Sequence, residues 1–450
     1  MIPLIRAVRR AADPKAAVVA ALRTEESDLI VSSPIGKPLR AVRLNLDKID
    51  RIFVVGAGKA SPAMAAGVEK VLGKRITGGL IVTKSDGPSR QSRTPHPSLR
   101  RIQVLEGSHP VPNAAGRRAA ARIYSLLQNL SRNDLVLVLI SGGASALLPY
   151  PAGKITLRDK QRITQKLLRS GAAIEEMNAV RKHLSMLKGG QLARRAAPAR
   201  MVSLILSDVI GSPLDVIGSG PTAPDSSTYH DAVDVLKNYG VWSGAPASVR
   251  RHLLAGRRGA VPESPKARDA FFRRVHNVIV GDNRLAVEAA SQKIRAMGYR
   301  PFILTTQLRG EAAEAANLFG ALARRIRVSG KPFSPPGCLI AGGELTVTVS
   351  GHGKGGRCQE FVLAGAREIA GLGGCTIAAF GTDGVDGPTD AAGAMADEKT
   401  LREAWERGLE LDRFIRQNDS YRFFRKMEKL IITGPTGTNV NDLYLLFIKK

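Results

Sequence analysis

The strongest constraint on the fold is a repeated alternation between short apolar runs and longer amphipathic helical patterns. This alternation favours βαβ units, so it predicts an α/β fold with a mostly parallel sheet. The helical patterns include residues 114–130, 284–297 and 311–328. The apolar runs that we predict as strands are residues 51–55, 80–83, 135–140, 201–206, 277–280, 301–305, 338–341, 346–349, 376–380 and 443–448.

Two segments rich in Gly and Pro divide this pattern into two parts. Residues 218–224 close the first group of strands, and residues 255–265 are polar and contain several breakers. We therefore predict a domain boundary near residue 240, with an N-terminal domain over residues 1–240 and a C-terminal domain over residues 241–450. A chain of 450 residues is long enough for two or three domains.

Composition limits the cellular setting. No run of eighteen apolar residues occurs, so we predict no membrane span. The chain has three cysteines, Cys338, Cys358 and Cys375, and their spacing does not match a zinc site. An odd number of cysteines argues against a disulfide scaffold, so we predict a reducing compartment and a cytoplasmic location. The Arg-rich start is compatible with a mitochondrial address, but we favour a first helix that runs on through residues 16–23.

The formal net charge of +28 raises the hypothesis of a nucleic-acid-binding protein. The basic residues are scattered in short pairs, however, and aromatic residues make up only 5% of the chain. A single-strand binder would interleave basic and aromatic residues along one groove. We therefore predict no specific nucleic-acid partner, and a basic surface that attracts small anionic substrates.

Six of the predicted strands lead into small or acidic residues rather than into ordinary turns. In open α/β sheets, ligands bind outside the carboxyl ends of the strands. Glycine there lets backbone amides approach a phosphate group, and the next helix adds a partial positive charge. This pattern predicts a phosphorylated ligand. The segments are residues 56–59, 141–145, 207–209, 281–283, 342–344 and 381–384.

Gly56, Gly58 and Lys59 follow one predicted strand and precede a helix. The segment is not a dinucleotide fingerprint, because Ser61 replaces the third glycine and no acid ends the next strand. It is not a P-loop either, because Ala60 stands where Ser or Thr is required. Two interpretations stay open: a tight turn with a solvated lysine, or a lysine directed at phosphate oxygens.

A second segment of small residues consists of Ser141, Gly142, Gly143, Ala144 and Ser145, directly after a very apolar run. Its amides and hydroxyls could cradle a triphosphate. The alternative is a close-packed turn beneath a helix. We discount a nucleophilic serine because the G-x-S-x-G elbow is absent.

Carboxylates cluster in residues 381–390, where Asp383 and Asp386 follow a strand predicted to be buried. Oxygen ligands at a strand end suit Mg²⁺, which takes one or two carboxylates and shares phosphate oxygens. A surface turn rich in Asp is the alternative. His96 and His109 each precede a proline, so we expect both in extended loops rather than in a metal site.

Arg357 stands near a predicted helix start, where the helix dipole disfavours a cation. We infer that an anion pairs with it, either a ligand or a neighbouring side chain. Cys358 is expected to be a small buried hydrophobic residue.

These segments together resemble the glycerate 2-kinases whose C-terminal part is called the MOFRL domain. The resemblance spans nearly the whole chain in family order. The family usually has Asn at the position of Cys358 and Asp at that of Asn113. The matching stretches are residues 56–61, 107–113, 141–148, 178–193, 207–222, 342–360, 381–393 and 433–443.

The resemblance implies an N-terminal Rossmann-like domain, a second α/β domain and an active site in the cleft between them. It implies ATP-dependent phosphorylation of D-glycerate to 2-phosphoglycerate. Lys59 and Arg357 match the catalytic lysine and arginine proposed for the family. Some relatives carry the name hydroxypyruvate reductase, so a nicotinamide-dependent reductase is the alternative function.

From this resemblance we expect Lys59 and Arg357 to neutralise the transferred phosphoryl group. Asp208, Asp383 or Asp386 would hold Mg²⁺, and one of them would accept the proton of the 2-hydroxyl group. Glu344 would contact the substrate or the metal. The partners expected are D-glycerate and ATP, and the sequence also allows a homodimer.

Overall fold

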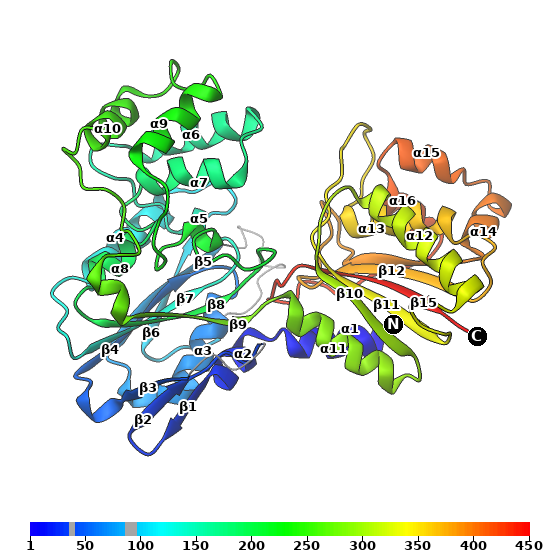
Figure 1. Cartoon of the computed structure of the whole chain (residues 1–450), viewed down its shortest axis with the longest axis horizontal. Helices are drawn as coiled ribbons and strands as arrows, with labels where there is room; N and C mark the ends of the chain where they lie inside the picture. The colour runs from blue at the N-terminus through cyan, green and yellow to red at the C-terminus, as the bar shows by residue number, and fades with distance from the viewer. Residues whose placement is uncertain (36–40, 86–96) are drawn as a thin grey trace. The chain divides into compact units, whose positions relative to one another are not determined.

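The computed structural model describes residues 1–35, 41–85 and 97–450, which form two compact units (Figure 1). The first unit comprises residues 14–280, and the second comprises residues 1–13 together with residues 281–450. The sequence predicted a boundary near residue 240. Residues 241–280 group with the first unit because α10 (Ala247–Arg257) packs on α9 (Tyr229–Asn238), and because β9 (Val275–Gly281) joins the first sheet.

The first unit is built around a six-stranded sheet in the order β6-β5-β4-β7-β8-β9. The pairings of β4 with β5 and β7, of β5 with β6, and of β7 with β8 are parallel, as the sequence predicted. Every residue of β7 is buried, which is typical of a parallel strand covered on both faces. The other bounds are β4 (Arg51–Ala57), β5 (Gly78–Lys84), β6 (Ile102–Gly107), β7 (Asp134–Ile140) and β8 (Arg200–Leu206).

Helices cover both faces of this sheet. One face packs against α3 (Ser61–Leu72), which in turn contacts α2 (Pro14–Ala21). The other face shares its apolar core with α4 (Ala114–Leu126), α5 (Ala144–Leu147) and α8 (Gln191–Ala196). A small antiparallel sheet lies beside α2 and α3 and consists of β1 (Leu22–Glu25), β2 (Asp28–Val31) and β3 (Val42–Asn45).

A separate helical group in the first unit has its own core. It consists of α6 (Leu157–Arg169) and α7 (Ile174–His183) together with α9 and α10 (Figure 1). Ile163, Leu167 and Val180 are buried there against Leu236 and Val249. Short 3₁₀ helices in this unit are η1 (Leu46–Lys48), η2 (Gly73–Arg75), η4 (Ile217–Ser219) and η5 (Ala270–Arg274).

The second unit contains a mixed sheet in the order β10-β11-β15-β12-β13-β14. Only β10 and β11 pair in parallel among its described pairings, so the prediction of a mostly parallel sheet holds for the first unit alone. The strand bounds are β10 (Arg300–Leu308), β11 (Gly337–Gly343), β12 (Cys375–Gly381), β13 (Gly393–Asp397), β14 (Leu430–Ile431) and β15 (Asp442–Ile448).

The helices of the second unit also lie on both faces of its sheet (Figure 1). On one face, α1 (Ile2–Ala11) packs against α11 (Asn283–Ala296). On the other face, the apolar core is shared with α12 (Ala312–Ser329), α13 (Arg357–Glu368), α14 (Thr400–Glu406), α15 (Leu411–Arg416) and α16 (Ser420–Lys426). Across the part of the chain that the structure describes, none of the helices combines the length and apolar content needed to cross a membrane.

Two local predictions are wrong. The first helix does not run on through residues 16–23, because α1 ends at Ala11 and α2 begins at Pro14. Proline suits a first helical position and disfavours helix in the residue before it. Residues 346–349 do not form a strand beyond one isolated bridge at Thr346, because the hydroxyls of Thr346 and Thr348 both bind the carboxylate of Glu311.

Candidate functional site

The turns after β4 and β7 pack against each other where the strand order of the first sheet reverses, which is where ligands bind in open α/β sheets. The amide of Lys59 donates a hydrogen bond to the carbonyl of Gly142 (2.9 Å), and the amide of Ala60 donates to Ser141 Oγ (3.1 Å). Gly58 has a φ of +142°, and a methyl group there would lie 2.0 Å from Ser141 Oγ. This close approach therefore requires glycine at position 58.

Gly56, which we predicted as a cofactor-binding residue, is required for strand packing. It lies inside β4, and a methyl group on it would be 2.1 Å from the backbone oxygen of Leu139 in β7. Glycine is thus needed for the close approach of two strands. The side chain of Lys59 is exposed and therefore accessible to a ligand.

Two side chains from other strand ends lie over the second turn. A methyl group on Gly142 would be 2.2 Å from Asp208 Oδ2, and one on Gly143 would be 3.1 Å from His109 Cδ2. Burial, together with the charges of Lys59 and Lys84, lowers the pKa of His109 to about 4. His109 is therefore a neutral imidazole near pH 7. Its loop position was predicted, but its place beside the glycine turn was not; His96 lies outside the described residues.

A cavity of about 420 Å³ opens beside these residues within the first unit. Part of its wall is apolar and comes from Pro110, Val111, Pro112, Pro149 and Leu168. Its polar part combines the serines and glycine of the turn with His109 and with charged side chains from several further segments. These polar lining residues include Ser141, Gly143, Ser145, His109, Asp208, Lys160, Arg181 and Lys188.

Three cationic side chains of this cavity were not singled out from the sequence. Lys188 is 2% exposed, and its Nζ donates to the carbonyl (2.7 Å) and the Oγ (2.8 Å) of Ser145. Lys160 is 5% exposed, and in residues 1–35, 41–85 and 97–450 its Nζ has no hydrogen-bond partner. Burial and the charge of Arg181 lower the pKa of Lys160 to about 7. Burial and the charges of Lys160 and Arg181 lower the pKa of Lys188 well below its usual range.

Ser145 is held by further hydrogen bonds. Its Oγ lies 2.9 Å from Ser219 Oγ, which donates to Asn178 Oδ1 (3.1 Å). Asn178 and Lys188 both belong to the stretch of residues 178–193 that carries the family resemblance. That stretch therefore helps to hold Ser145 of the serine-glycine turn in place through these hydrogen bonds.

A second polar cluster forms in the second unit where β11 and β12 end and β15 begins. Asp442 begins β15 and pairs with Gly343 in β11 and Gly381 in β12. Arg357 opens α13, and its Nε and Nη2 donate to the two oxygens of Asp442 (2.5 and 3.1 Å). Its Nη1 lies 2.7 Å from Glu344 Oε1. The anion predicted beside Arg357 thus includes two protein carboxylates.

The two aspartates predicted to bind metal have different surroundings. Asp386 is 3% exposed and accepts hydrogen bonds from the amides of Cys358 (3.1 Å) and Gln359 (2.9 Å) at the start of α13. Burial outweighs these bonds and raises the pKa of Asp386 to about 6. Asp383 is less buried, and its Oδ1 accepts from the amide of Val385 (3.1 Å).

The residues present fit a magnesium ion that is shared with phosphate. Among the described residues, no three His, Cys, Asp or Glu side chains gather as a complete metal centre. Mg²⁺, however, usually takes one or two carboxylates and completes its shell with water and phosphate oxygens. A methyl group on Gly381 would lie 3.2 Å from Asp383 Oδ1 and 3.3 Å from Asp442 Oδ1, so both carboxylates flank this glycine.

The two departures from the family pattern have structural explanations. Asn113 caps α4, and its Oδ1 accepts from the amide of Gly116 (2.9 Å). Asn and Asp are equally good at this position, so the exchange preserves the cap. Cys358 is fully buried in the apolar core of the second unit, as the sequence predicted.

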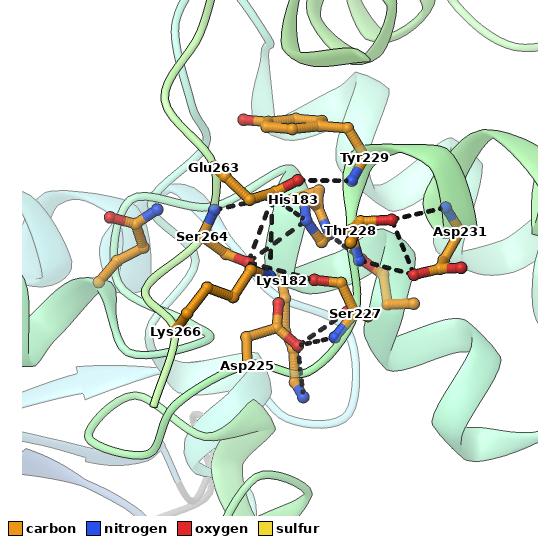
Figure 2. Close-up of polar contacts among 12 residues, drawn as sticks. Lys182, His183, Asp225, Ser227, Thr228, Tyr229, Asp231, Glu263, Ser264 and Lys266 are labelled. Carbon is orange, nitrogen blue, oxygen red and sulfur yellow. Dashed lines mark hydrogen bonds and ion pairs between the residues drawn. The ribbon is translucent and has the colours of Figure 1, made fainter. Parts of the chain in front are cut away.

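A network beside the stretch of residues 178–193 anchors it to two loops (Figure 2). His183 Nδ1 lies 2.7 Å from the carbonyl of Ala179, and its Nε2 lies 2.7 Å from Glu263 Oε1. Glu263 Oε2 accepts from the amide of Tyr229 (3.1 Å). Burial would raise the pKa of Glu263, but hydrogen bonds from His183, Ser264 and Tyr229 lower it to about 2.

Comparison with known proteins decides the family. Residues 3–254 match a domain of unknown function, DUF4147, and residues 337–442 match the MOFRL family. A glycerate 2-kinase of Pyrococcus horikoshii is 39% identical over 440 residues, which cover 98% of this chain and 94% of the relative. This chain belongs to the glycerate 2-kinase family. The resemblance inferred from the sequence is therefore confirmed.

Other members of the glycerate 2-kinase family are equally similar. A D-glycerate 2-kinase of Thermotoga maritima is 40% identical and covers 91% of this chain and 94% of its own. The crystal structure of a glycerate kinase from the same organism is 37% identical, with a TM-score of 0.83 over 99% of this chain and 98% of its own. A relative from Agrobacterium vitis, 41% identical with 88% of this chain and 87% of its own covered, bears a provisional name as a hydroxypyruvate reductase.

Proposed function

We propose that this chain transfers the terminal phosphoryl group of ATP to the 2-hydroxyl group of D-glycerate, producing 2-phosphoglycerate and ADP. The observation that carries the proposal is similarity over nearly the whole chain to proteins named glycerate 2-kinase. Both family regions and the polar ends of both sheets lie within the part that is similar. The reaction forms a bond from the 2-oxygen to phosphorus and breaks the bond from phosphorus to the departing ADP.

In the first unit, we assign Lys59 to the charge that develops on the transferred phosphoryl group. Its exposed side chain follows directly on the turn that is hydrogen-bonded to Gly142. Ser141, Gly142, Gly143, Ala144 and Ser145 would cradle phosphates, and Gly58 allows the close approach of the two turns. Phosphoryl transfer depends mainly on such positioning and neutralisation of charge.

Asp208 is our choice for the residue that accepts the proton of the 2-hydroxyl group. Its carboxylate lies beside Gly142 and lines the cavity, so it is near the proposed phosphate cradle. A base must be within hydrogen-bond reach of the proton that it removes. Asp208 would take up the proton of the 2-hydroxyl group as the 2-oxygen attacks phosphorus.

In the second unit, Arg357 and Glu344 would contact substrate groups, with Asp442 fixing the orientation of the guanidinium. Asp383 is our preferred magnesium ligand because its carboxylate flanks Gly381 beside Asp442. Asp386, also predicted as a ligand, is bound by amides of α13, which favours a positioning role. When bound, magnesium would neutralise part of the phosphate charge.

The reaction is tested by measuring ADP release with D-glycerate and by phosphorus NMR of the product. The proposal expects ADP release that depends on D-glycerate and a resonance of 2-phosphoglycerate. A 3-phosphoglycerate product would refute the assigned position. Oxidation of NADH with hydroxypyruvate, without ADP release, would instead support the reductase suggested by the name of the Agrobacterium vitis relative.

We also infer a cytoplasmic location and allow a homodimer. The three cysteines are all buried and unbridged, which suits a reducing compartment. Fractionation of cells that express the tagged protein tests the location. Size-exclusion chromatography with light scattering tests the assembly, and a monomer mass at micromolar concentration would refute the homodimer.

A further inference from the structure

The cavity of the first unit contains a cluster of three cationic side chains, two buried and one partly buried, that the proposed chemistry does not yet use. Lys160 comes from α6, Arg181 from α7, and Lys188 from the segment that follows α7. In the part of the chain that the structure describes, none of the three forms an ion pair with a carboxylate. Burying like charges without a counter-charge is costly, so such a cluster points to an anion that binds there.

Lys182 shows how the same protein satisfies a buried lysine that has only a structural role. Its Nζ lies 3.2 Å from Asp225 Oδ1 and 3.3 Å from Asp215 Oδ2 (Figure 2 shows Lys182 and Asp225). Lys160 is buried to the same extent but lacks any such partner among the described residues. The contrast between Lys182 and Lys160 indicates that the anionic partner of Lys160 is a bound ligand.

We propose that Lys160, Arg181 and Lys188 form the subsite for the polyphosphate of the nucleotide substrate, an inference that rests on the proposed kinase function. Lys188 connects this subsite with the predicted cradle, because its Nζ binds both the carbonyl and the hydroxyl of Ser145. The phosphate chain would thus extend from the serine-glycine turn into the cation cluster.

The chemistry of the cavity favours a polyphosphate over the carboxylate of the hydroxy acid. D-glycerate carries one negative charge, which would leave a cluster of three cations largely uncompensated, whereas a triphosphate carries several. The apolar part of the cavity, formed by Pro110, Val111 and Leu168, offers no partner for a small polar acid. It can accept the less polar part of a larger ligand such as a nucleoside.

Binding is tested on the full chain with three probes: tripolyphosphate, ATP and D-glycerate, each titrated calorimetrically in magnesium-free buffer. Lys160→Met should weaken tripolyphosphate and ATP binding by about tenfold to a hundredfold, because a charge-assisted contact is lost. Its D-glycerate binding should be unchanged. Lys154→Met is the matched control, since Lys154 is exposed on the preceding loop, and it should bind all three probes as the wild type does.

Thermal unfolding separates ligand binding from a purely structural role. Without ligand, Lys160→Met should unfold at the same or a higher temperature, because it removes an unpaired buried charge. Tripolyphosphate should then stabilise the wild type but not the variant. Arg181→Met should show the same loss of ligand-induced stabilisation, which keeps the test valid if one variant fails to fold.

Proton linkage provides an independent readout. With a pKa of about 7 in a cavity shared with Arg181, Lys188, His109 and Asp208, Lys160 is mostly neutral at pH 8. An anion should raise that pKa, so binding should take up a proton. Titrations in two buffers of different ionisation enthalpy should show this uptake in the wild type and a smaller uptake in Lys160→Met, where Lys188, whose pKa is also lowered, remains.

The subsite is refuted if tripolyphosphate fails to bind the wild type, or binds Lys160→Met equally well. A variant that loses D-glycerate binding alone would also overturn it. The two proposals are distinguishable, because Lys160-dependent tripolyphosphate binding without phosphoryl transfer would contradict the kinase and keep the anion site.

Discussion

Lys59 and Arg357, the two cations predicted to act in catalysis, differ in what their side chains contact. The side chain of Lys59 is exposed on a turn. The guanidinium of Arg357 binds Asp442, a carboxylate that is 2% exposed. The consequences of substituting them should therefore differ: Lys59 can be removed without disturbing packing, whereas removal of Arg357 leaves a buried charge unpaired.

Lys59→Ala should reduce kcat by about two to four orders of magnitude while the unfolding temperature stays unchanged, because a charge on the transferred phosphoryl group is no longer neutralised. Steady-state kinetics with D-glycerate and ATP, together with thermal unfolding, measure both quantities. Lys70→Ala is the control, since Lys70 is an exposed lysine of α3. Near-normal turnover of Lys59→Ala would remove Lys59 from the mechanism.

Arg357→Met should lower the free energy of unfolding by about 2–4 kcal/mol, because Asp442 loses its bidentate partner. Urea unfolding followed by circular dichroism measures the change. The double variant Arg357→Met/Asp442→Asn should recover part of the stability, since it removes the buried charge as well. If the double variant is less stable than Arg357→Met, the ion pair is not the cause of the loss.

At the scale of elements, the helical group depends on one carboxylate between α7, α9 and the loop at residues 263–266 (Figure 2). Glu263 binds His183 of α7 and the amide of Tyr229 at the start of α9. Because α7 carries Arg181 and leads to Lys188, this network positions the cation cluster of the cavity. Because Glu263 is titratable, the stability of this helical group should depend on pH.

The pKa of Glu263 is about 2 in the folded chain, below its ordinary value of 4.5, so Glu263 stabilises the fold above pH 4.5 and less as pH falls towards 2. Glu263→Gln should lower the free energy of unfolding by about 1–2 kcal/mol at pH 7, after allowance for solvent screening of this half-buried group. Urea unfolding at pH 7 and pH 3 measures the difference, which should shrink at pH 3. Glu175→Gln, at an exposed position of α7, should show no such pH dependence.

At the scale of the whole molecule, the chain's first helix belongs to the unit that is otherwise built from its last 170 residues. Leu4 and Val8 of α1 are 0% and 1% exposed, and α1 packs against α11. The hydroxyl of Thr438 also donates to the carbonyl of Ala12 (2.6 Å). The second unit is therefore discontinuous in sequence, whereas the first is one continuous segment.

Leu4→Ala should destabilise the second unit by about 2–4 kcal/mol through the cavity that it creates. Hydrogen exchange with peptide-level resolution should show faster exchange in residues 281–450 and little change in residues 14–280. Ile2→Ala, which alters a residue of the same helix that is 65% exposed, is the control. Equal acceleration in both units would contradict the assignment of α1 to the second unit.

The α/β class, most of the long strands and the family could be predicted from the amino-acid sequence. These follow from local signals: the period of apolar residues, the glycine and acidic residues at strand ends, and long shared motifs. Short strands such as β1 and β13 were not predicted, because few residues carry their pattern. The capping of α4 by Asn113 and the burial of Cys358 also agree with local chemistry.

Which charged side chains are paired, and which are not, could be learned only from the folded chain. Arg357 binds Asp442, a residue 85 positions further along the chain, and no local pattern specifies such a partner. The burial of Lys160 and Lys188, and the place of His109 beside Gly143, likewise depend on contacts between distant segments. The cost of burying a charge is set by its three-dimensional surroundings, so this information does not exist in any short stretch of sequence.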